Sequence, residues 1–389
     1  MKLMTRLCPG LSAGNPDDSH QLLTAPGRFS RQSGLSLVEL MVAVVIGLVG
    51  ILAMTQAYIT SDRFNRATMG EGSAQTNGLI AMYQLERDLR MSGYGIANST
   101  ALGCGQIRWF YTPNYSTNIN ASSTLPAITL APVVITTSGT DPHTITTFFS
   151  TVSEQIMPTV VANFTAATNK ATLDGAAAFS AGDLLLFVTR TLPTTCAFGR
   201  ITSKSGQEIT MASGVAGGQF NPAAWASFPT YASDDSVLNL GFPAIRTYSI
   251  TSRKLRVTDL LDQAAGQAPI DVVDGIVDMR AQYGKDNGGG GGTANDGVVD
   301  EYNSTTPTTT AEWQQVLSIR LAVLARVGTY EKPATGTDCD ATTATNAPTW
   351  SGGSFANMDF ATTTSEDRCY RYRVYESNVP LRNMIWRAL

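Results

Sequence analysis

One long apolar run near the N-terminus dominates the pattern of hydrophobic and polar positions. Residues 40–54 contain no polar side chain, and the run extends over residues 35–59 with a single charge, at Glu39. As an α-helix this segment would measure roughly 37 Å, enough to cross the ~30 Å hydrocarbon core of a bilayer. Arg28 and Arg31 precede it, and such basic residues favour the cytoplasmic side of a membrane. The pattern therefore predicts one membrane-spanning helix, with the rest of the chain exported.

A cleavable secretory signal peptide is the alternative explanation of an apolar N-terminal run. Such a signal ends in a small-residue cleavage site of the A-x-A type. Residues 55–68, which follow the run, contain no such ending, and the run is long for a signal peptide. The sequence therefore favours a helix that is retained.

Beyond the run, the apolar positions take on helical spacing. Between residues 61 and 90 they recur near every third or fourth position, at Phe64, Leu79, Met82, Leu85 and Leu89. Gly70 and Gly72 interrupt this pattern, and because glycine weakens a helix interior we expect a kink or partial melting there. Gly93 and Gly95 are suited to end the helix. We therefore predict a helix over residues 35–93, with residues 35–59 in the membrane.

From residue 94 onward the pattern is that of β-strands. Short runs rich in Val, Ile, Thr and Phe alternate with turn-forming residues, with no repeat and no second strong helix pattern. The candidate strands are residues 127–136, 143–150, 183–189, 197–202, 208–212, 245–250, 254–257, 272–283, 315–327 and 370–377. We predict an α+β fold, in which the long helix packs on a large antiparallel β-rich head formed by residues 94–389.

Composition and charge exclude several classes of protein. The formal net charge is −4 and 15% of the residues are charged, so a general nucleic-acid binder, which needs a basic surface, is not expected. A hydrophobic fraction of 43% argues against both a disordered chain and a polytopic membrane protein. The histidines, His20 and His143, have no visible nucleophile beside them. The sequence therefore indicates no enzyme and implies no cofactor.

Residues 285–312 form the most unusual stretch of the head. Five consecutive glycines lie among acidic residues, and four of these are candidate calcium ligands: Asp286, Asp296, Asp300 and Glu301. The spacing fails the EF-hand pattern, and no G-K-[ST] follows the glycines to make a phosphate loop. A flexible Gly-rich loop is the main prediction here, with calcium binding as a weaker hypothesis.

The chain has five cysteines, of which Cys8 precedes the apolar run. The other four are exported if the helix prediction holds, and an oxidising location favours two disulfides. Three pairings are open among Cys104, Cys196, Cys339 and Cys369. No C-x-x-C pair is present, which argues against a zinc site.

The start of the apolar run carries a specific motif. Residues 31–34, Arg-Gln-Ser-Gly, are followed by Leu-Ser-Leu-Val-Glu at residues 35–39. A glycine before an apolar stretch whose fifth residue is glutamate resembles the signal of type IV pilins and pseudopilins. The resemblance implies a leader of residues 1–34, which is long for this class. It also implies a prepilin peptidase that cuts after Gly34 and methylates the new amine of Leu35.

Glu39 has a role in this resemblance. A carboxylate within a membrane-spanning helix costs roughly 2.5–3.5 kcal/mol on insertion scales, so such residues are functional by default. The resemblance implies that Glu39 neutralises the N-terminal amine of a neighbouring subunit, which would set the register of assembly.

Further stretches resemble the PilW-type minor pilins. They are residues 85–94, 273–284, 313–326 and 371–383, whereas residues 100–240 match nothing with confidence. In pilin heads a disulfide often closes a short loop near the C-terminus, so the resemblance favours Cys339–Cys369 and hence Cys104–Cys196.

The resemblance implies a minor pilin that primes type IV pilus assembly and lies at or near the tip. Its partners would be other minor pilins, the major pilin, a large tip adhesin, the prepilin peptidase and, during assembly, the inner membrane. The chain would be a single-pass inner-membrane protein with a periplasmic head, and then part of the extracellular pilus of a Gram-negative bacterium. The alternative is a J-type pseudopilin of a type II secretion system.

Overall fold

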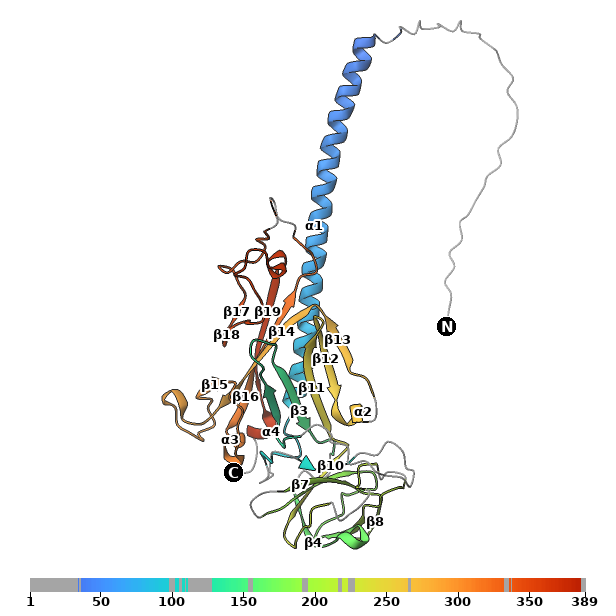
Figure 1. Cartoon of the computed structure of the whole chain (residues 1–389), viewed down its shortest axis with the longest axis vertical. Helices are drawn as coiled ribbons and strands as arrows, with labels where there is room; N and C mark the ends of the chain where they lie inside the picture. The colour runs from blue at the N-terminus through green and yellow to red at the C-terminus, as the bar shows by residue number, and fades with distance from the viewer. Residues whose placement is uncertain are drawn as a thin grey trace, which may run out of the picture. The chain divides into compact units, whose positions relative to one another are not determined.

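The computed structural model describes residues 34, 36–97, 102–104, 107–108, 110, 128–152, 157–190, 195–215, 219–222, 228–264, 267–331, 336 and 338–385. The chain divides into two compact units, residues 1–62 and 63–389. All the strands among the described residues lie in the second unit, where they form three sheets and a small hairpin (Figure 1).

The long helix is confirmed as α1, which runs from Leu37 to Met91. In the first unit, every described side chain from residue 36 to residue 61 is exposed. The helix ends just before Gly93, whose φ of +83° lies in the left-handed region that glycine adopts without strain. The expected stop is therefore found where the sequence indicated it.

The buried face of α1 in the second unit agrees in part with the expected one. Met82, Leu85 and Leu89 are buried as expected, whereas Phe64 and Leu79 are exposed, at 73% and 54%. The other buried positions include Ala74, Ala81 and Asp88. Small residues dominate the first half of this face, so large apolar side chains do not mark it there.

Gly70 and Gly78 explain why that face is poor in large side chains. A Cβ on Gly70 would lie 2.5 Å from Oγ1 of Thr329, and one on Gly78 would lie 2.0 Å from the ring of Tyr375. The expected kink at Gly70 and Gly72 is wrong, because α1 continues unbroken through both. Gly70 instead lets the head approach the helix backbone closely.

A four-stranded antiparallel sheet packs beside α1, in the order β15-β14-β16-β19. Its strands are β14 (Ile276–Lys285), β15 (Glu301–Asn303), β16 (Val316–Arg326) and β19 (Tyr372–Pro380). The strand expected over residues 272–283 is two strands, because Gly275, with φ +79°, separates β13 (Ile270–Asp274) from β14. This sheet carries the C-terminal half of the head.

A five-stranded sheet has the order β13-β12-β11-β3-β2. Its further strands are β2 (Val133–Thr136), β3 (Thr144–Phe149), β11 (Ala244–Thr251) and β12 (Lys254–Asp259). The short helix α2 (Leu260–Ala264) follows β12. Side chains of both sheets and of α1 join in one hydrophobic core.

The third sheet is an insertion in the second. Ala244 of β11 pairs with Phe149 of β3, so residues 150–243 occupy what would otherwise be a hairpin connection. Their strands are β4 (Thr159–Thr165), β5 (Lys170–Leu173), β6 (Leu184–Val188), β7 (Cys196–Arg200), β8 (Ser203–Ser205), β9 (Glu208–Thr210) and β10 (Ser236–Gly241), with β1 (Ile107–Arg108) at one edge. The sheet buries one face against the main core and the other around a second core that includes Phe187 and Tyr231.

The stretch expected as one flexible loop, residues 285–312, contains regular structure. It holds the single turn η3 (Gly289–Gly291), strand β15 paired with β14, and the start of α3 (Thr310–Gln314). Thr309 and Glu312 cap α3 reciprocally. The remaining short elements are η1 (Ala166–Thr168), β17 (Thr349–Trp350), β18 (Gly353–Ser354), η4 (Glu366–Cys369) and α4 (Arg382–Ile385).

Candidate functional site

The glycine–glutamate motif lies at the N-terminus of α1. Gly34 is exposed, and a Cβ placed on it would meet nothing within 4 Å. Leu35, the residue expected to be methylated, lies outside the described residues. The chain itself therefore places no steric demand for glycine at position 34.

Ser36 caps the helix, a role that the sequence analysis missed. Its side-chain oxygen accepts the backbone N–H of Glu39 at 3.4 Å, and its carbonyl accepts that of Leu40 at 3.1 Å. A serine followed three residues later by a glutamate is the known signature of such a cap, so the signal was present in the sequence.

Glu39 lies in the first turn of α1 with its side chain exposed. Within the described part of the chain, its carboxylate has no ion-pair or hydrogen-bond partner. A carboxylate is stabilised at a helix N-terminus by the helix dipole. The side chain is thus positioned in the apolar segment and open to a cation from outside the chain.

The apolar segment itself satisfies the length requirement for a membrane span. Among the described residues, α1 is the helix long and apolar enough to cross a bilayer by length and composition. In the described part of the first unit, nothing covers the exposed apolar side chains between residues 37 and 59. They suit either a bilayer or the helices of other subunits.

A buried carboxylate joins α1 to the head in the second unit. Asp88 is fully buried, and its Oδ2 accepts from Tyr248 at 2.7 Å and from Arg246 at 3.0 Å. Its Oδ1 accepts from Nε of Arg87 at 3.1 Å. Burial, followed by the charge of Asp88, raises the pKa of Tyr248, so the phenol stays protonated and donates. The pattern of apolar positions in residues 85–94 does not single out Asp88.

Four more polar contacts fix the helix along its length. The carbonyl of Arg66 accepts from Thr329, and Glu71 pairs with Arg373. Farther along, Asn77 donates to the carbonyl of Asp274 at 3.0 Å. At the C-terminal end, the Asn383 amide donates to the carbonyls of Met91 and Ser92 at 3.0 and 3.1 Å. These contacts position α1 against both the four- and the five-stranded sheet.

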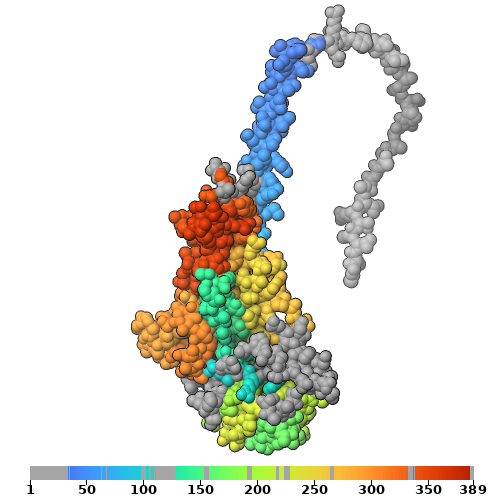
Figure 2. All heavy atoms as spheres, viewed as in Figure 1, coloured from blue at the N-terminus to red at the C-terminus, as the bar shows by residue number. Residues whose placement is uncertain are grey.

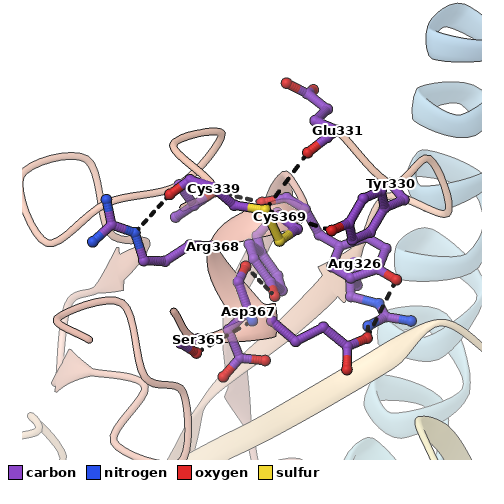
Figure 3. The surroundings of a disulfide bond; sticks show 12 residues. Arg326, Tyr330, Glu331, Cys339, Ser365, Asp367, Arg368 and Cys369 are labelled. Atoms are coloured by element: carbon purple, nitrogen blue, oxygen red, sulfur yellow. Dashed lines mark hydrogen bonds and ion pairs between the residues drawn. A yellow bond between two sulfur atoms is a disulfide. The ribbon is translucent and has the colours of Figure 1, made fainter. Parts of the chain in front are cut away.

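The structure pairs Cys339 with Cys369, one of the two pairs favoured above. Figure 3 shows how the chain is held around this bond. The N–H of Glu331 donates to the carbonyl of Cys369 at 2.8 Å, and Nε of Arg368 donates to that of Cys339 at 2.9 Å. The disulfide thereby anchors the segment that carries Thr329, which contacts the helix.

The second disulfide joins Cys104 to Cys196, the other favoured pair. Cys104 precedes the insertion and Cys196 begins β7 within it. Their sequence separation is 92 residues. The bond therefore ties the inserted sheet covalently to the body of the head.

The calcium hypothesis for the Gly-rich stretch is not supported by the geometry. Asp286 is buried, and its carboxylate accepts backbone N–H groups from residues 295, 296 and 297. Asp300 accepts from the N–H of Gly288, and Glu301 accepts from the amides of Asn287 and Asn303. In the described ranges, no three His, Cys, Asp or Glu side chains are grouped to hold a metal ion. Asp296 accepts the N–H of Val298 at 2.9 Å, so all four candidates organise the loop through N–H donors.

His143 has a packing role. Its Nδ1 accepts the backbone N–H of Ala281 at 3.1 Å, and the backbone N–H of His143 donates to the carbonyl of Met279 at 2.8 Å. Burial, then the nearby Arg280, lowers the pKa of its imidazole. The ring is thus neutral and links the segment before β3 to β14.

Comparisons with known proteins agree with the motif and the helix. Residues 244–383 match the family model described as type IV pilus-assembly protein W, and residues 29–55 match the prokaryotic N-terminal methylation motif. Among solved structures, a type IV-like pilin from Thermus thermophilus is similar at 12% identity and a TM-score of 0.29, over 79% of this chain and 95% of that one. The comparison with curated proteins gave no match.

The two matched regions correspond to parts of the molecule already described. The methylation motif covers Gly34, Glu39 and the start of α1, and the other match begins at Ala244, the first residue of β11. The inserted sheet lies outside both matches. The chain therefore matches the PilW family of type IV pilus assembly proteins over residues 244–383 and carries the prokaryotic N-terminal methylation motif at residues 29–55.

Proposed function

We propose that this protein is a minor pilin that primes assembly of the type IV pilus and lies at or near its tip. The inserted sheet is the observation that carries the proposal. It begins at Ser150, whose N–H donates to the carbonyl of Tyr94 just after the end of α1. Within the second unit, the sheet lies beyond that end of the helix (Figure 1).

The position of the insertion favours a subunit with nothing assembled in front of it. Subunits that pack through parallel helices stack their heads along the direction in which the helices run. A β-sheet with its own core, built onto the C-terminal end of the helix, fills space that the head of a preceding subunit would need. A subunit at the tip has no preceding neighbour, so the sheet is accommodated there.

The N-terminal motif supports entry into such a filament. We propose that prepilin peptidase cuts after Gly34 and that the amine of Leu35 is methylated. We further propose that Glu39 pairs with the terminal amine of an adjacent subunit, because its carboxylate is exposed and unpartnered in the described residues. Two charges that are each costly in hydrocarbon stabilise one another when paired.

Variants at the motif test this part of the proposal. In Gly34→Ala the chain's own structure has room for the methyl group, so any loss of processing reflects the peptidase. We expect an unprocessed, membrane-bound precursor on immunoblots. Glu39→Gln should be processed normally but should enter sheared pili poorly, and Asp62→Asn serves as a matched charge-removal control on the same helix. Normal incorporation of Glu39→Gln would contradict the pairing.

The proposed location and partners follow from the same argument. Before assembly the chain would sit in the inner membrane through α1 with its head in the periplasm, and afterwards it would belong to the extracellular pilus of a Gram-negative bacterium. Its partners would be other minor pilins, the major pilin and a large tip adhesin at the distal end. The match to a pilus-assembly family favours this over the alternative, a J-type pseudopilin of a type II secretion system.

A deletion strain tests the proposed priming role. Surface pili are counted by electron microscopy with and without the retraction motor. We expect few pili in the deletion strain and recovery when retraction is also removed, because a primer lowers the barrier to starting a filament. Wild-type pilus numbers in both backgrounds would contradict priming, and a protein secretion defect with normal pili would favour the pseudopilin.

A further inference from the structure

A groove of about 570 Å³ lies between α1 and the edge of the five-stranded sheet. Gln84 and Arg87 form its helical side, and the other side consists of β12, the residues after α2, and β13. Figure 2 shows this part of the head beside α1 as the surface formed by residues 254–274. The groove contains none of the residues of the pilin motif and takes no part in the proposed priming role.

β13 offers a free sheet edge along this groove. Among the described strands, β13 pairs only with β12, and Asn77 caps the carbonyl at the far end of the strand, that of Asp274. Ile270, at the start of the strand, is 66% exposed. The charged side chains of β13 do not shield the edge, because Asp271 turns to Lys254 and Arg256 on the neighbouring strand. Unshielded edges of this kind accept an added strand.

The charges around the groove are balanced except at one point. The guanidiniums of Arg87 and Arg246 are both held by Asp88, and Arg246 also lies 3.5 Å from Asp259. Asp262, at the start of α2, has no cation within ion-pair distance in the described residues. Burial, then the charge of Asp262, raises the pKa of Asp259. A cation beside Asp262 would therefore supply the counter-charge that this carboxylate lacks among the described residues.

We propose that the groove binds an extended polypeptide segment that adds to β13 as a further strand. The segment places one lysine or arginine beside Asp262 and Asp259, and an apolar side chain over Ile270. Backbone hydrogen bonds along β13 supply affinity, and the basic residue supplies selectivity. The segment comes from a partner protein, and its recognition does not depend on the chain's place in a pilus.

Defined peptides test the proposal on the full chain in detergent micelles, by fluorescence anisotropy. The first peptide is an alternating valine–threonine strand with one central lysine, and the second has glutamate in place of the lysine. A third keeps the lysine but is N-methylated at alternate residues, so one edge cannot form backbone hydrogen bonds. We expect the lysine peptide to bind, the glutamate peptide to bind more weakly, and the N-methylated peptide not to bind.

Variants of the protein locate the binding. Asp262→Asn should weaken the lysine peptide about two- to fivefold, as for loss of one exposed ion pair, without affecting the fold. Asp274→Asn removes a charge from the other end of β13 and should leave binding unchanged. Amides of β13 should also gain protection from hydrogen exchange when the lysine peptide is bound. The proposal is overturned by no binding at millimolar peptide, by equal effects of the two variants, or by equal binding of the N-methylated peptide.

Discussion

Asp88 is the residue on which the attachment of α1 to the head depends most. Its carboxylate is fully buried and receives donors from Arg87 on the helix and from Arg246 and Tyr248 on β11. Hydrogen bonds to a buried charge are stronger than those between neutral groups, but they also make the loss of one partner costly. The apolar neighbours Leu85 and Leu89 complete the contact.

We expect Asp88→Asn to lower the free energy of unfolding by about 2–4 kcal/mol, because Arg246 loses its buried counter-ion and keeps only the longer pair with Asp259, 3.5 Å away. Urea unfolding of the detergent-solubilised chain, followed by tryptophan fluorescence, measures this. Glu86→Gln is the matched control, since Glu86 forms only an exposed pair with Arg90 one turn away, and its loss should cost at most about 0.5 kcal/mol. Equal effects of the two variants would contradict the role given to Asp88.

The lowered pKa of His143 makes the free energy of unfolding depend on pH. Burial and Arg280 lower its pKa from 6.5, so the folded head keeps the ring neutral while the unfolded chain takes up a proton near that value. The unfolded state then binds more protons as the pH falls through this range, so the free energy of unfolding decreases below about pH 6.5. His143→Asn keeps an acceptor for the N–H of Ala281 but cannot be protonated.

Comparing the wild type with His143→Asn separates the histidine's effect on stability from that of the carboxylates, which are common to both proteins. Chemical unfolding at about pH 7 and about pH 5 should show a larger loss of stability for the wild type than for His143→Asn. Parallel curves for the two proteins would show that the ring is not held neutral.

At the scale of elements, the sequence predicts α1 well and its contacts poorly. Residues 35–59 have an unmistakable apolar pattern, and Gly93 marks the end of the helix, so its length follows from local signals. The packed face follows from local signals only in part. In its first half, Gly70 and Gly78 lie where the sheets come close to the helix, and a pattern of hydrophobic positions does not show such glycines. The close approach depends on Thr329 and Tyr375, which lie far away in sequence.

Substitutions at Gly78 and Gly72 of α1 should change the free energy of unfolding in opposite directions. Gly78→Ala forces the ring of Tyr375 to move, so we expect it to destabilise the head by about 1–3 kcal/mol despite the better helix propensity of alanine. At Gly72 a Cβ meets nothing within 4 Å, so Gly72→Ala should stabilise by up to about 1 kcal/mol. Thermal or urea unfolding of both variants checks this, and a stabilising Gly78→Ala would show that the helix does not pack as described.

Some strands follow from local sequence patterns and others do not. Alternating apolar residues located β3, β11 and β16, each of which carries a clear buried face. The strands β4, β5 and β10 were not expected from the sequence. The apolar run of β10 is interrupted by the polar residue Asn239. This side chain can be buried because it donates to the carbonyl of Ala178 and to Asp183. A polarity pattern cannot anticipate such a partner.

At the scale of the whole molecule, the main point is the insertion between β3 and β11. Local patterns show strands on both sides but not that Phe149 pairs with Ala244, so this topology was not predictable from the sequence. The role of Asp286 was not predictable for a related reason, since the backbone N–H groups that it accepts depend on the path of the loop. The glycine–glutamate motif was identified from residues 31–39 alone because it is local.

Localising the chain in the filament distinguishes a tip subunit from one that lies along the shaft. An epitope inserted after Gly206, in the exposed turn between β8 and β9 where a Cβ meets nothing within 4 Å, should leave the fold intact. Immunogold electron microscopy of pili from that strain should place label at one end of each filament, as expected for a tip subunit whose inserted sheet has no subunit in front of it. Gold particles spaced along the filament would contradict a tip position and the account of the insertion built on it.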